Sequence, residues 1–297
     1  MPTGHLILFA DRCCAAILSE PMNDGEFLAI FLTEENSVRR FVLLLSCSTL
    51  FIASALGQTT AQASPPATDN SDVSKLRAEV ESQQKKLNDW ANLHRYRDEN
   101  ARLSPPKQGQ DRVVFMGDSI TDIWGRQQGK FFPGKPYINR GISGQTTPQM
   151  LVRFRPDVVN LHPKVVVILA GTNDIAGNTG PESLADIENN LSSMADLAKA
   201  NKIAVVLATV TPVCDDYKQQ TQRRPPAQIV KLNDWIKQYA GQNGLTLLDY
   251  YSAMVDDHGR LKKDLTYDGL HPNAQGFEVM GPLAEKAIAE AESRRQQ

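Results

Sequence analysis

Short runs of β-forming residues alternate with helix-length segments from residue 111 to the end of this 297-residue chain. The runs predict strands at residues 112–116, 136–139, 164–169, 202–208 and 245–249. The segments between and after them predict helices at about residues 119–126, 147–160, 181–200, 226–242 and 274–293. Repeated alternation of this kind is typical of a parallel sheet covered by helices on both faces. We therefore predict an α/β domain with a three-layer, doubly wound architecture around a central, mostly parallel five-stranded sheet.

Motifs of polar residues and glycine lie at or just beyond the ends of three predicted strands, and a fourth motif precedes the last predicted helix. In chain order they are Gly117-Asp118-Ser119-Ile120-Thr121, Asn139-Arg140-Gly141, Gly171-Thr172-Asn173-Asp174 and Asp268-Gly269-Leu270-His271-Pro272. Residues at the carboxyl ends of parallel strands gather at one edge of an open sheet, where ligands bind. We therefore expect a serine, a glycine, an asparagine and an Asp–His pair to share one cleft. Acyl transfer uses such groups as nucleophile, oxyanion donors, base and orienting carboxylate.

The four motifs in this order resemble those of the GDSL, or SGNH, hydrolase family of esterases and lipases. The letters S, G, N and H in the name SGNH correspond here to Ser119, Gly141, Asn173 and His271. The resemblance extends over roughly residues 111–292. It departs from the motif Gly-Asp-Ser-Leu at one position, where this chain has Ile120 in place of leucine. It implies a flavodoxin-like SGNH hydrolase fold and the hydrolysis of carboxylic esters without a cofactor or a metal ion.

The resemblance also implies a role for each residue of the predicted site. Ser119 would be the nucleophile, His271 the base that takes its proton, and Asp268 the carboxylate that orients the imidazole. The backbone amides of Ser119 and Gly141 and the side-chain amide of Asn173 would form the oxyanion hole. Each motif also has an ordinary structural interpretation, because Ser, Asp and Asn commonly cap helices and turns.

The resemblance does not choose a substrate, because one fold hosts many activities. The segment 212–226, expected at the lip of the cleft, is polar and lacks a large apolar lid. We therefore expect short acyl chains on a small molecule or a polysaccharide, such as an acetylated carbohydrate. Lysophospholipase or thioesterase activity is an alternative, and so is a non-catalytic secreted module that binds a glycan or a protein. Phosphodiester or sulfate hydrolysis would need a metal site or an arginine pair, for which Arg126 and Arg140 are the nearby candidates.

Charge and cysteine content exclude other classes of protein. The formal net charge is −2 and no run of Lys or Arg is present, so we expect no nucleic-acid partner. Of the four cysteines only Cys214 lies in the predicted catalytic segment. This leaves no intrachain disulfide there and no Cys-rich zinc spacing. We expect Cys214 to be an unreactive packing residue, because Asp215 and Asp216 disfavour its thiolate.

The first 63 residues carry the signals of export. Arg39-Arg40, the apolar run 41–56 and Ala61-Gln62-Ala63 correspond to the three parts of a secretory signal peptide. We predict a signal peptide at about residues 38–63, cleavage after Ala63, and a secreted or periplasmic protein. The apolar run is shorter than the ~20 residues of a spanning helix. No integral membrane association is therefore expected once the signal has been removed.

Residues 1–37 are acidic, which is unusual ahead of a signal peptide, and we expect translation to start downstream, near Val38. The chain then divides into three parts. They are an N-terminal extension with the signal peptide at 1–63, a linker with an amphipathic helix at 64–110, and a catalytic domain at 111–297.

The part ahead of the catalytic domain combines a flexible linker at 64–71 with apolar residues at helical spacing, which predict a helix over about residues 72–101. Two interpretations remain open. In the favoured one, the helix docks on the catalytic domain through Leu87, Trp90, Leu93 and Tyr96. In the other, it forms a coiled coil that drives dimerisation, although fewer than the usual ~3–4 heptads are present. The oligomeric state is left open.

Overall fold

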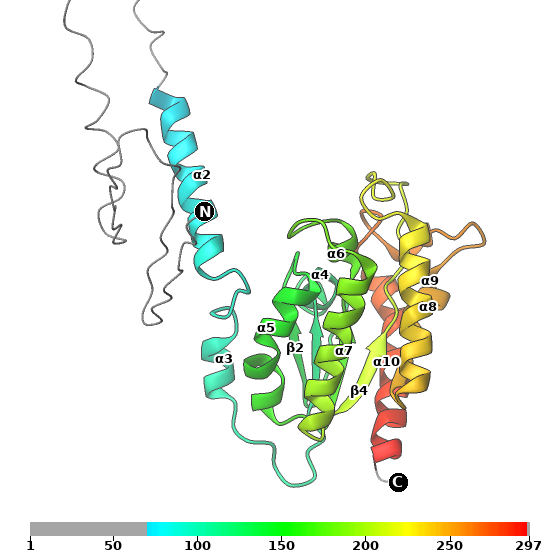
Figure 1. The fold of residues 1–297 in the computed structure, drawn as a ribbon. Helices are drawn as coiled ribbons and strands as arrows, with labels where there is room; N and C mark the ends of the chain where they lie inside the picture. The colour runs from blue at the N-terminus through cyan, green and yellow to red at the C-terminus, as the bar shows by residue number, and fades with distance from the viewer. Residues whose placement is uncertain (1–69, 296–297) are drawn as a thin grey trace, which may run out of the picture. The chain divides into compact units, whose positions relative to one another are not determined.

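The structure is a computed structural model that describes residues 70–295. These residues belong to one compact unit with a five-stranded sheet between layers of helices (Figure 1). The predicted signal peptide, its cleavage site, the downstream start and most of the linker lie outside the described residues. No helix between residues 70 and 295 is long and apolar enough to cross a membrane.

The sheet confirms the predicted architecture. Its strands are β1 Val113–Gly117, β2 Tyr137–Gly141, β3 Val165–Leu169, β4 Ala204–Ala208 and β5 Thr246–Leu248. All neighbours pair in parallel, in the order β2-β1-β3-β4-β5. The chain therefore starts in the middle of the sheet, moves to one edge and then crosses to the other. The switch in direction lies between β1 and β3, which is where ligands bind in open α/β sheets.

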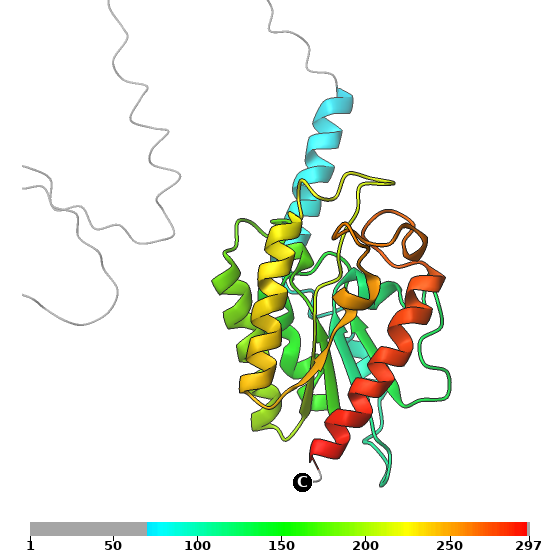
Figure 2. The same cartoon turned by 90° about the vertical axis from the view of Figure 1, so that its right-hand side faces the viewer.

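Helices cover both faces of the sheet, as Figures 1 and 2 show. One face carries α5 Thr147–Asp157, α7 Leu184–Ala200 and α8 Pro226–Gln242. The other carries α4 Ser119–Ile123, α9 Tyr250–Met254 and α10 Ala274–Arg295. The two-residue period of a strand divides β1 between these layers. Val114 and Met116 pack in the first apolar cluster, and Val113 and Phe115 pack in the second.

The strand ends lie at one level where the predicted motifs begin. Gly117 at the end of β1 is in register with Gly141 of β2 and Leu169 of β3. The polar residues that follow these strands are therefore brought to the same edge of the sheet. Shorter elements complete the part of the chain from β1 onward: helix α6 Thr172–Ile175 and 3₁₀ turns at Val159–Leu161 and Lys263–Leu265.

The segment ahead of the sheet differs from the predicted single helix over 72–101. It contains two helices, α2 Asn70–Asn88 and α3 Arg97–Arg102, separated by a turn. The Asp89 carboxylate accepts the backbone N–H groups of Leu93 and His94, at 2.7 and 3.0 Å. These bonds replace the helical ladder locally, because a short polar side chain competes for the same donors.

The predicted docking of this segment through Leu87, Trp90 and Leu93 is wrong, because all three side chains are exposed. The fourth predicted residue, Tyr96, does dock on the catalytic domain, together with a contact from Gln145 that was not predicted. Tyr96 is fully buried and its hydroxyl donates to the carbonyl of Gly141. The Gln145 side chain donates to the carbonyl of Ala91 at 2.8 Å. The turn after α2 is therefore anchored beside β2, although α2 itself is not docked.

Candidate active site

Three of the predicted site residues form a continuous hydrogen-bonded series. His271 Nε2 lies 2.9 Å from Ser119 Oγ, and His271 Nδ1 lies 2.8 Å from Asp268 Oδ2. An ionised carboxylate can only accept, so this contact places the ring proton on Nδ1 and leaves Nε2 free to accept from the serine. Burial raises the pKa of Asp268, but hydrogen bonds from His271 outweigh it and hold that pKa below its usual range. This arrangement can activate a hydroxyl for nucleophilic attack.

The serine stands at a tight turn from β1 into α4. Asp118 caps the helix, with its Oδ1 accepting the backbone N–H of Ile120 at 2.9 Å. Ser119 is the first residue of α4, so its own backbone N–H has no acceptor within the helix. This N–H is therefore available to an anion at the same place as the hydroxyl.

The loop of residues 266–272 sets the position of the histidine. Asp268 Oδ1 accepts the backbone N–H groups of Leu270 and His271, at 3.0 and 2.8 Å. Gly269 has a φ of +87°, and a Cβ there would lie 2.2 Å from the carbonyl oxygen of Cys214. The tight loop thus depends on glycine. The exposed ring of Tyr267 stacks against the imidazole of His271 with centroids 5.8 Å apart, which further orients the base.

Asn173 also reaches this edge, in α6 after β3. Its Nδ2 donates to the carbonyl of Gln145 at 3.0 Å, which leaves the second amide hydrogen without an intramolecular acceptor in the described structure. Its Oδ1 accepts from Nη2 of Arg224 at 3.2 Å. The side-chain amide is buried and held at both ends, as a preorganised donor requires.

Gly141 does not offer the free N–H expected of an oxyanion donor. Its backbone N–H donates to Oδ1 of Asn139 at 2.9 Å. A Cβ at this position would lie 2.2 Å from the backbone nitrogen of Asp122. The prediction that Gly141 contributes to an oxyanion hole is therefore contradicted, and the close approach of α4 explains why the residue is glycine.

Gly144, which the sequence reasoning missed, has the properties expected of the second backbone donor. It adopts a φ of +82°, and its N–H has no hydrogen-bond acceptor among the described residues. Its carbonyl accepts from Nδ2 of Asn178 at 3.0 Å. The next residue, Gln145, is the one whose carbonyl binds Asn173. The sequence signal was present as a second glycine in Gly141-Ile142-Ser143-Gly144, but only the three-dimensional contacts distinguish the two.

Arg224 is a further residue of the site that was not singled out from the sequence, where it is one of several polar residues in the segment 212–226. Its guanidinium is buried and donates to Asn173, to Thr172 Oγ1 at 3.1 Å and to Gln220 Oε1 at 3.1 Å. Gln220 in turn donates to the carbonyl of Asp268 at 3.2 Å. One arginine thus connects the asparagine to the loop that carries the histidine.

Two buried carboxyl groups lie beside these residues. Burial raises the pKa of Asp118 to about 6, opposed by the Ile120 amide and the charges of His271 and Arg224. Burial also raises the pKa of Asp174 to about 7, although its hydrogen bonds from Thr147 favour the charged form. Asp174 accepts the Thr147 backbone N–H at 2.7 Å and so fixes the start of α5. Both aspartates serve the architecture of the site.

The other candidates from the sequence lie elsewhere. Cys214 is buried and its pKa is raised by burial, which agrees with an unreactive packing residue. Arg140 binds Asn100 through Nε at 3.0 Å, and Arg126 binds the Tyr96 hydroxyl through Nη1 at 3.1 Å. The arginine pair considered for phosphodiester chemistry is thus engaged with α3 and with the anchored turn. Between residues 70 and 295, no cluster of three or more His, Cys, Asp or Glu could hold a metal ion.

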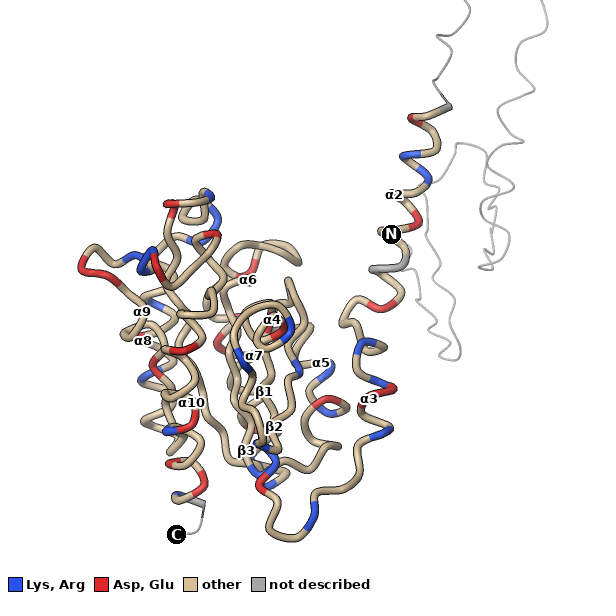
Figure 3. Tube along the Cα trace, turned by 180° about the vertical axis from the view of Figure 1, so that it is seen from behind, with Lys and Arg blue, Asp and Glu red and all other residues tan. Residues whose placement is uncertain are grey.

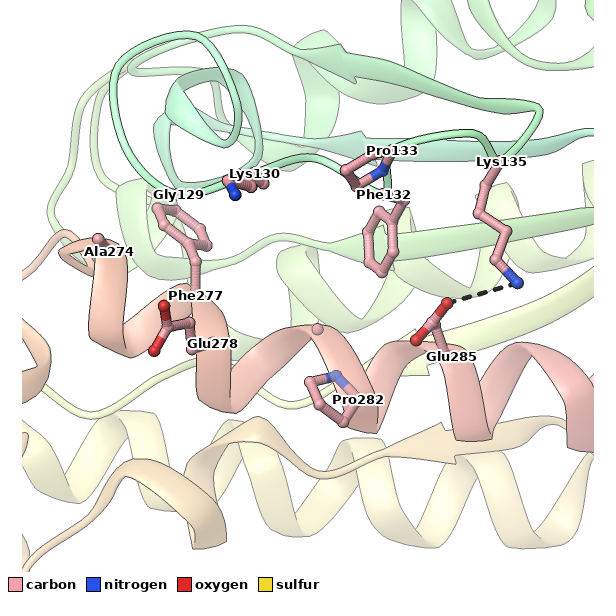
Figure 4. A pocket seen from close by; sticks show the side chains of 11 residues that line it. Gly129, Lys130, Phe132, Pro133, Lys135, Ala274, Phe277, Glu278, Pro282 and Glu285 are labelled. Carbon is pink, nitrogen blue, oxygen red and sulfur yellow. Dashed lines mark ion pairs between the residues drawn. The ribbon is translucent and has the colours of Figure 1, made fainter.

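A pocket of about 470 Å³ lies between α10 and the loop of residues 129–135 (Figure 4). Phe132 and Phe277 line it, and Lys135 and Glu285 form an ion pair of 3.6 Å at its edge. None of the hydrogen-bonded Ser, His and Asp residues lines this pocket, so it is separate from the candidate active site.

The fold and the hydrogen-bonded Ser–His–Asp series are those of an SGNH-type α/β hydrolase. Residues 115–279 match the model of the GDSL-like lipase/acylhydrolase family, and the chain belongs to this family. A solved structure of a proposed acylhydrolase from Bacteroides fragilis is 45% identical, with a TM-score of 0.65, over 68% of this chain and 98% of that one. A GDSL-like lipase from Bacteroides thetaiotaomicron is also 45% identical, with a TM-score of 0.64 and the same coverage.

A curated relative from Xylanibacter ruminicola is named acetylxylan esterase. It is 27% identical over 221 residues, which are 63% of this chain and 45% of the relative. The chain thus spans less than half the length of that relative.

Proposed function

We propose that this chain is a serine carboxylic-ester hydrolase with Ser119 as nucleophile, His271 as base and Asp268 as the orienting carboxylate. The observation that carries the proposal is the series of contacts of 2.9 and 2.8 Å that joins the three side chains. A non-catalytic binding module has no need of a serine aligned with a histidine whose tautomer is fixed by a carboxylate.

In the proposed reaction, Ser119 Oγ attacks the acyl carbon while His271 Nε2 takes its proton. The imidazolium is stabilised by the ionised Asp268 and then returns the proton to the leaving alcohol. A water molecule, deprotonated by the same imidazole, attacks the acyl-serine. The imidazolium then returns the proton to Ser119 Oγ as the acyl–oxygen bond breaks and the carboxylic acid leaves. The chemistry needs no cofactor.

The tetrahedral oxyanion would be bound by three donors. They are the backbone N–H of Ser119, the free N–H of Gly144 and the second amide hydrogen of Asn173. Gly144 replaces Gly141 in this role because the Gly141 N–H is already engaged by Asn139. Removing one such donor typically costs ~10²–10³-fold in kcat.

We further propose that the substrates carry short acyl groups, as acetylated carbohydrates do. The polar segment 212–226 at the rim supports this, because a long acyl chain would need an apolar surface to bind. The name of the Xylanibacter ruminicola relative points in the same direction. Lysophospholipase or thioesterase activity remains the alternative within the family.

The proposal for export rests on residues 38–63 alone. Mass spectrometry of the protein recovered from the periplasm or the medium tests it. A mature terminus at Ser64 supports the proposal, and an uncleaved chain retained in membranes contradicts it.

A panel of p-nitrophenyl esters from acetate to palmitate, together with acetylated xylan, tests the proposed reaction. Ser119→Ala is the matched control for adventitious hydrolysis. We expect kcat/KM to be greatest for acetate and to fall with chain length. A maximum at long acyl chains would favour the lipid-directed alternative, and no hydrolysis of any ester would contradict the proposal.

A further inference from the structure

Large apolar side chains lie exposed along α2 and at the turn that follows it. The exposed fractions are 62% for Leu76, 61% for Val80 and 74% for Leu87, followed by 42% for Trp90 and 38% for Leu93. Contiguous apolar groups are uncommon on monomeric proteins and mark interaction sites. No helix or strand of the described chain packs along α2, as Figures 1 and 2 also show.

The exposed apolar side chains form a stripe along α2, and their spacing indicates that the partner of this stripe is another helix. Val73, Leu76, Val80, Gln83, Leu87 and Trp90 follow one another at steps of 3, 4, 3, 4 and 3 residues. This is the pattern of the a and d positions in a coiled coil, where the period of 3.5 keeps one seam on the partner helix. Gln83 is the one polar position in the seam, and a single polar layer specifies register at some cost in stability.

The chain just after the C-terminal end of α2 is held by a hydrogen bond, whereas the apolar stripe is exposed. The Gln149 side chain donates to the carbonyl of Trp90 at 2.6 Å. A hollow of about 840 Å³ lies between this end of α2 and the loops of residues 142–145 and 178–179. Gln83, Leu87 and Trp90 line it, so the C-terminal half of the stripe borders an open hollow.

The charges beside the stripe favour two parallel copies. Acidic and basic residues are interspersed along α2, as Figure 3 shows. In the heptad register above, Asp72 occupies a g position and Arg77 the e position that faces it from a parallel partner. Parallel pairing therefore gives two attractive Asp72–Arg77 contacts.

We propose that α2 pairs in parallel with α2 of a second copy of this chain and makes the protein a dimer. With 19 residues, α2 is shorter than the ~3–4 heptads of an independent coiled coil. The exposed side chains of Trp90, Leu93 and Val152 extend the apolar surface beyond the helix. Val152 lies on α5 one turn after Gln149, which holds Trp90.

Light scattering and sedimentation velocity of the full chain, over about 1–100 µM, test the proposal. We expect twice the mass of one chain at the higher concentrations. Val80→Glu and Leu87→Glu should each shift the dimer toward the monomer by at least tenfold in Kd. Because both side chains are exposed in the single chain, neither change should lower its Tm. Ala78→Glu, on the opposite face of α2, is the matched control and should leave the dimer intact.

A charge exchange tests the orientation. Asp72→Arg should weaken the dimer, and Asp72→Arg combined with Arg77→Asp should restore it. A monomer at all concentrations, a dimer that survives Val80→Glu and Leu87→Glu, or equal loss with Ala78→Glu would overturn the proposal. A monomer that instead binds phospholipid vesicles through the same stripe would overturn it too. Failure of the charge exchange to restore association would overturn the parallel arrangement.

Discussion

Arg224 Nη2 donates a hydrogen bond to Asn173 Oδ1 at a distance of 3.2 Å. An arginine can only donate, so this contact fixes which end of the asparagine amide is oxygen and which is nitrogen. The NH₂ group is thereby turned toward Gln145 and the proposed oxyanion position. The guanidinium is buried, so its positive charge is only weakly screened there.

We predict that Arg224→Met lowers kcat by about tenfold or more with little change in KM, because the asparagine donor loses its fixed orientation. Kinetics on p-nitrophenyl acetate provide the measurement, and Lys218→Met is a control at an exposed position of the same segment. The double variant Asn173→Ala with Arg224→Met should have a kcat only slightly below that of Asn173→Ala alone, because the two residues act as one unit. Additive losses would show that Arg224 acts independently of Asn173.

Gly141 and Gly144 can be separated by alanine substitutions. Gly141→Ala should lower Tm strongly, because its Cβ would lie 2.2 Å from the Asp122 nitrogen. A Cβ at Gly144 would meet only Nδ2 of Asn178, at 3.9 Å, so Gly144→Ala bears little more than the strain of a positive φ, roughly 1–2 kcal/mol. Its main effect should be on kcat, through displacement of the proposed N–H donor. Thermal unfolding and kcat measured on both variants decide the assignment. If Gly141→Ala instead lowered mainly kcat and Gly144→Ala lowered mainly Tm, Gly141 would be the oxyanion donor.

The fold was predictable because its signals are local and mutually consistent. The apolar run Val165–Leu169 is typical of a strand that is buried on both faces of a covered parallel sheet, and it forms β3. The residues after the strands then had to meet at one edge. For this reason Ser119, Asn173 and the loop with Asp268 and His271 could be placed together before any contact was known.

The errors arose where tertiary contacts decide. The spacing of apolar residues over 72–101 does not reveal that Asp89 captures the amides that would continue α2. The choice between Gly141 and Gly144 depends on the side chain of Asn139 and the backbone of Asp122, which only folding brings close. Arg224 is indistinguishable in sequence from the exposed charges around it, and its burial follows from the packing of α6 and the 212–226 segment.

The raised pKa of Asp174 predicts a pH dependence of stability. Its folded-state pKa of about 7 lies above the unfolded value of 3.8. The folded state therefore holds more protons between these values, and the free energy of unfolding should fall as pH rises through this range. Asp174→Asn should reduce that slope, since its amide oxygen can still accept from Thr147. Urea titrations from pH 4 to pH 8 provide the measurement. The charge of Glu182 also raises this pKa, so Glu182→Gln should reduce the slope as well.

Asp268→Asn should leave the fold intact and lower kcat by about 10³–10⁴-fold, because an amide donor facing Nδ1 favours the wrong imidazole tautomer. The Asn oxygen can still accept the Leu270 and His271 backbone amides that shape the loop. Circular dichroism and kcat on one preparation separate the two effects. Near-native kcat in the folded variant would remove Asp268 from the mechanism. Added chelator should leave the wild-type rate unchanged.

The central claim is that Ser119 is the nucleophile, and an active-site phosphonate tests it most directly. The protein would be inactivated with a fluorophosphonate, digested and mapped by mass spectrometry, with Ser119→Ala as the paired sample. We predict one adduct per chain, on Ser119, formed in parallel with the loss of esterase activity and absent from the alanine variant. An adduct on another residue that tracks the loss of activity, or full esterase activity in Ser119→Ala, would contradict the account.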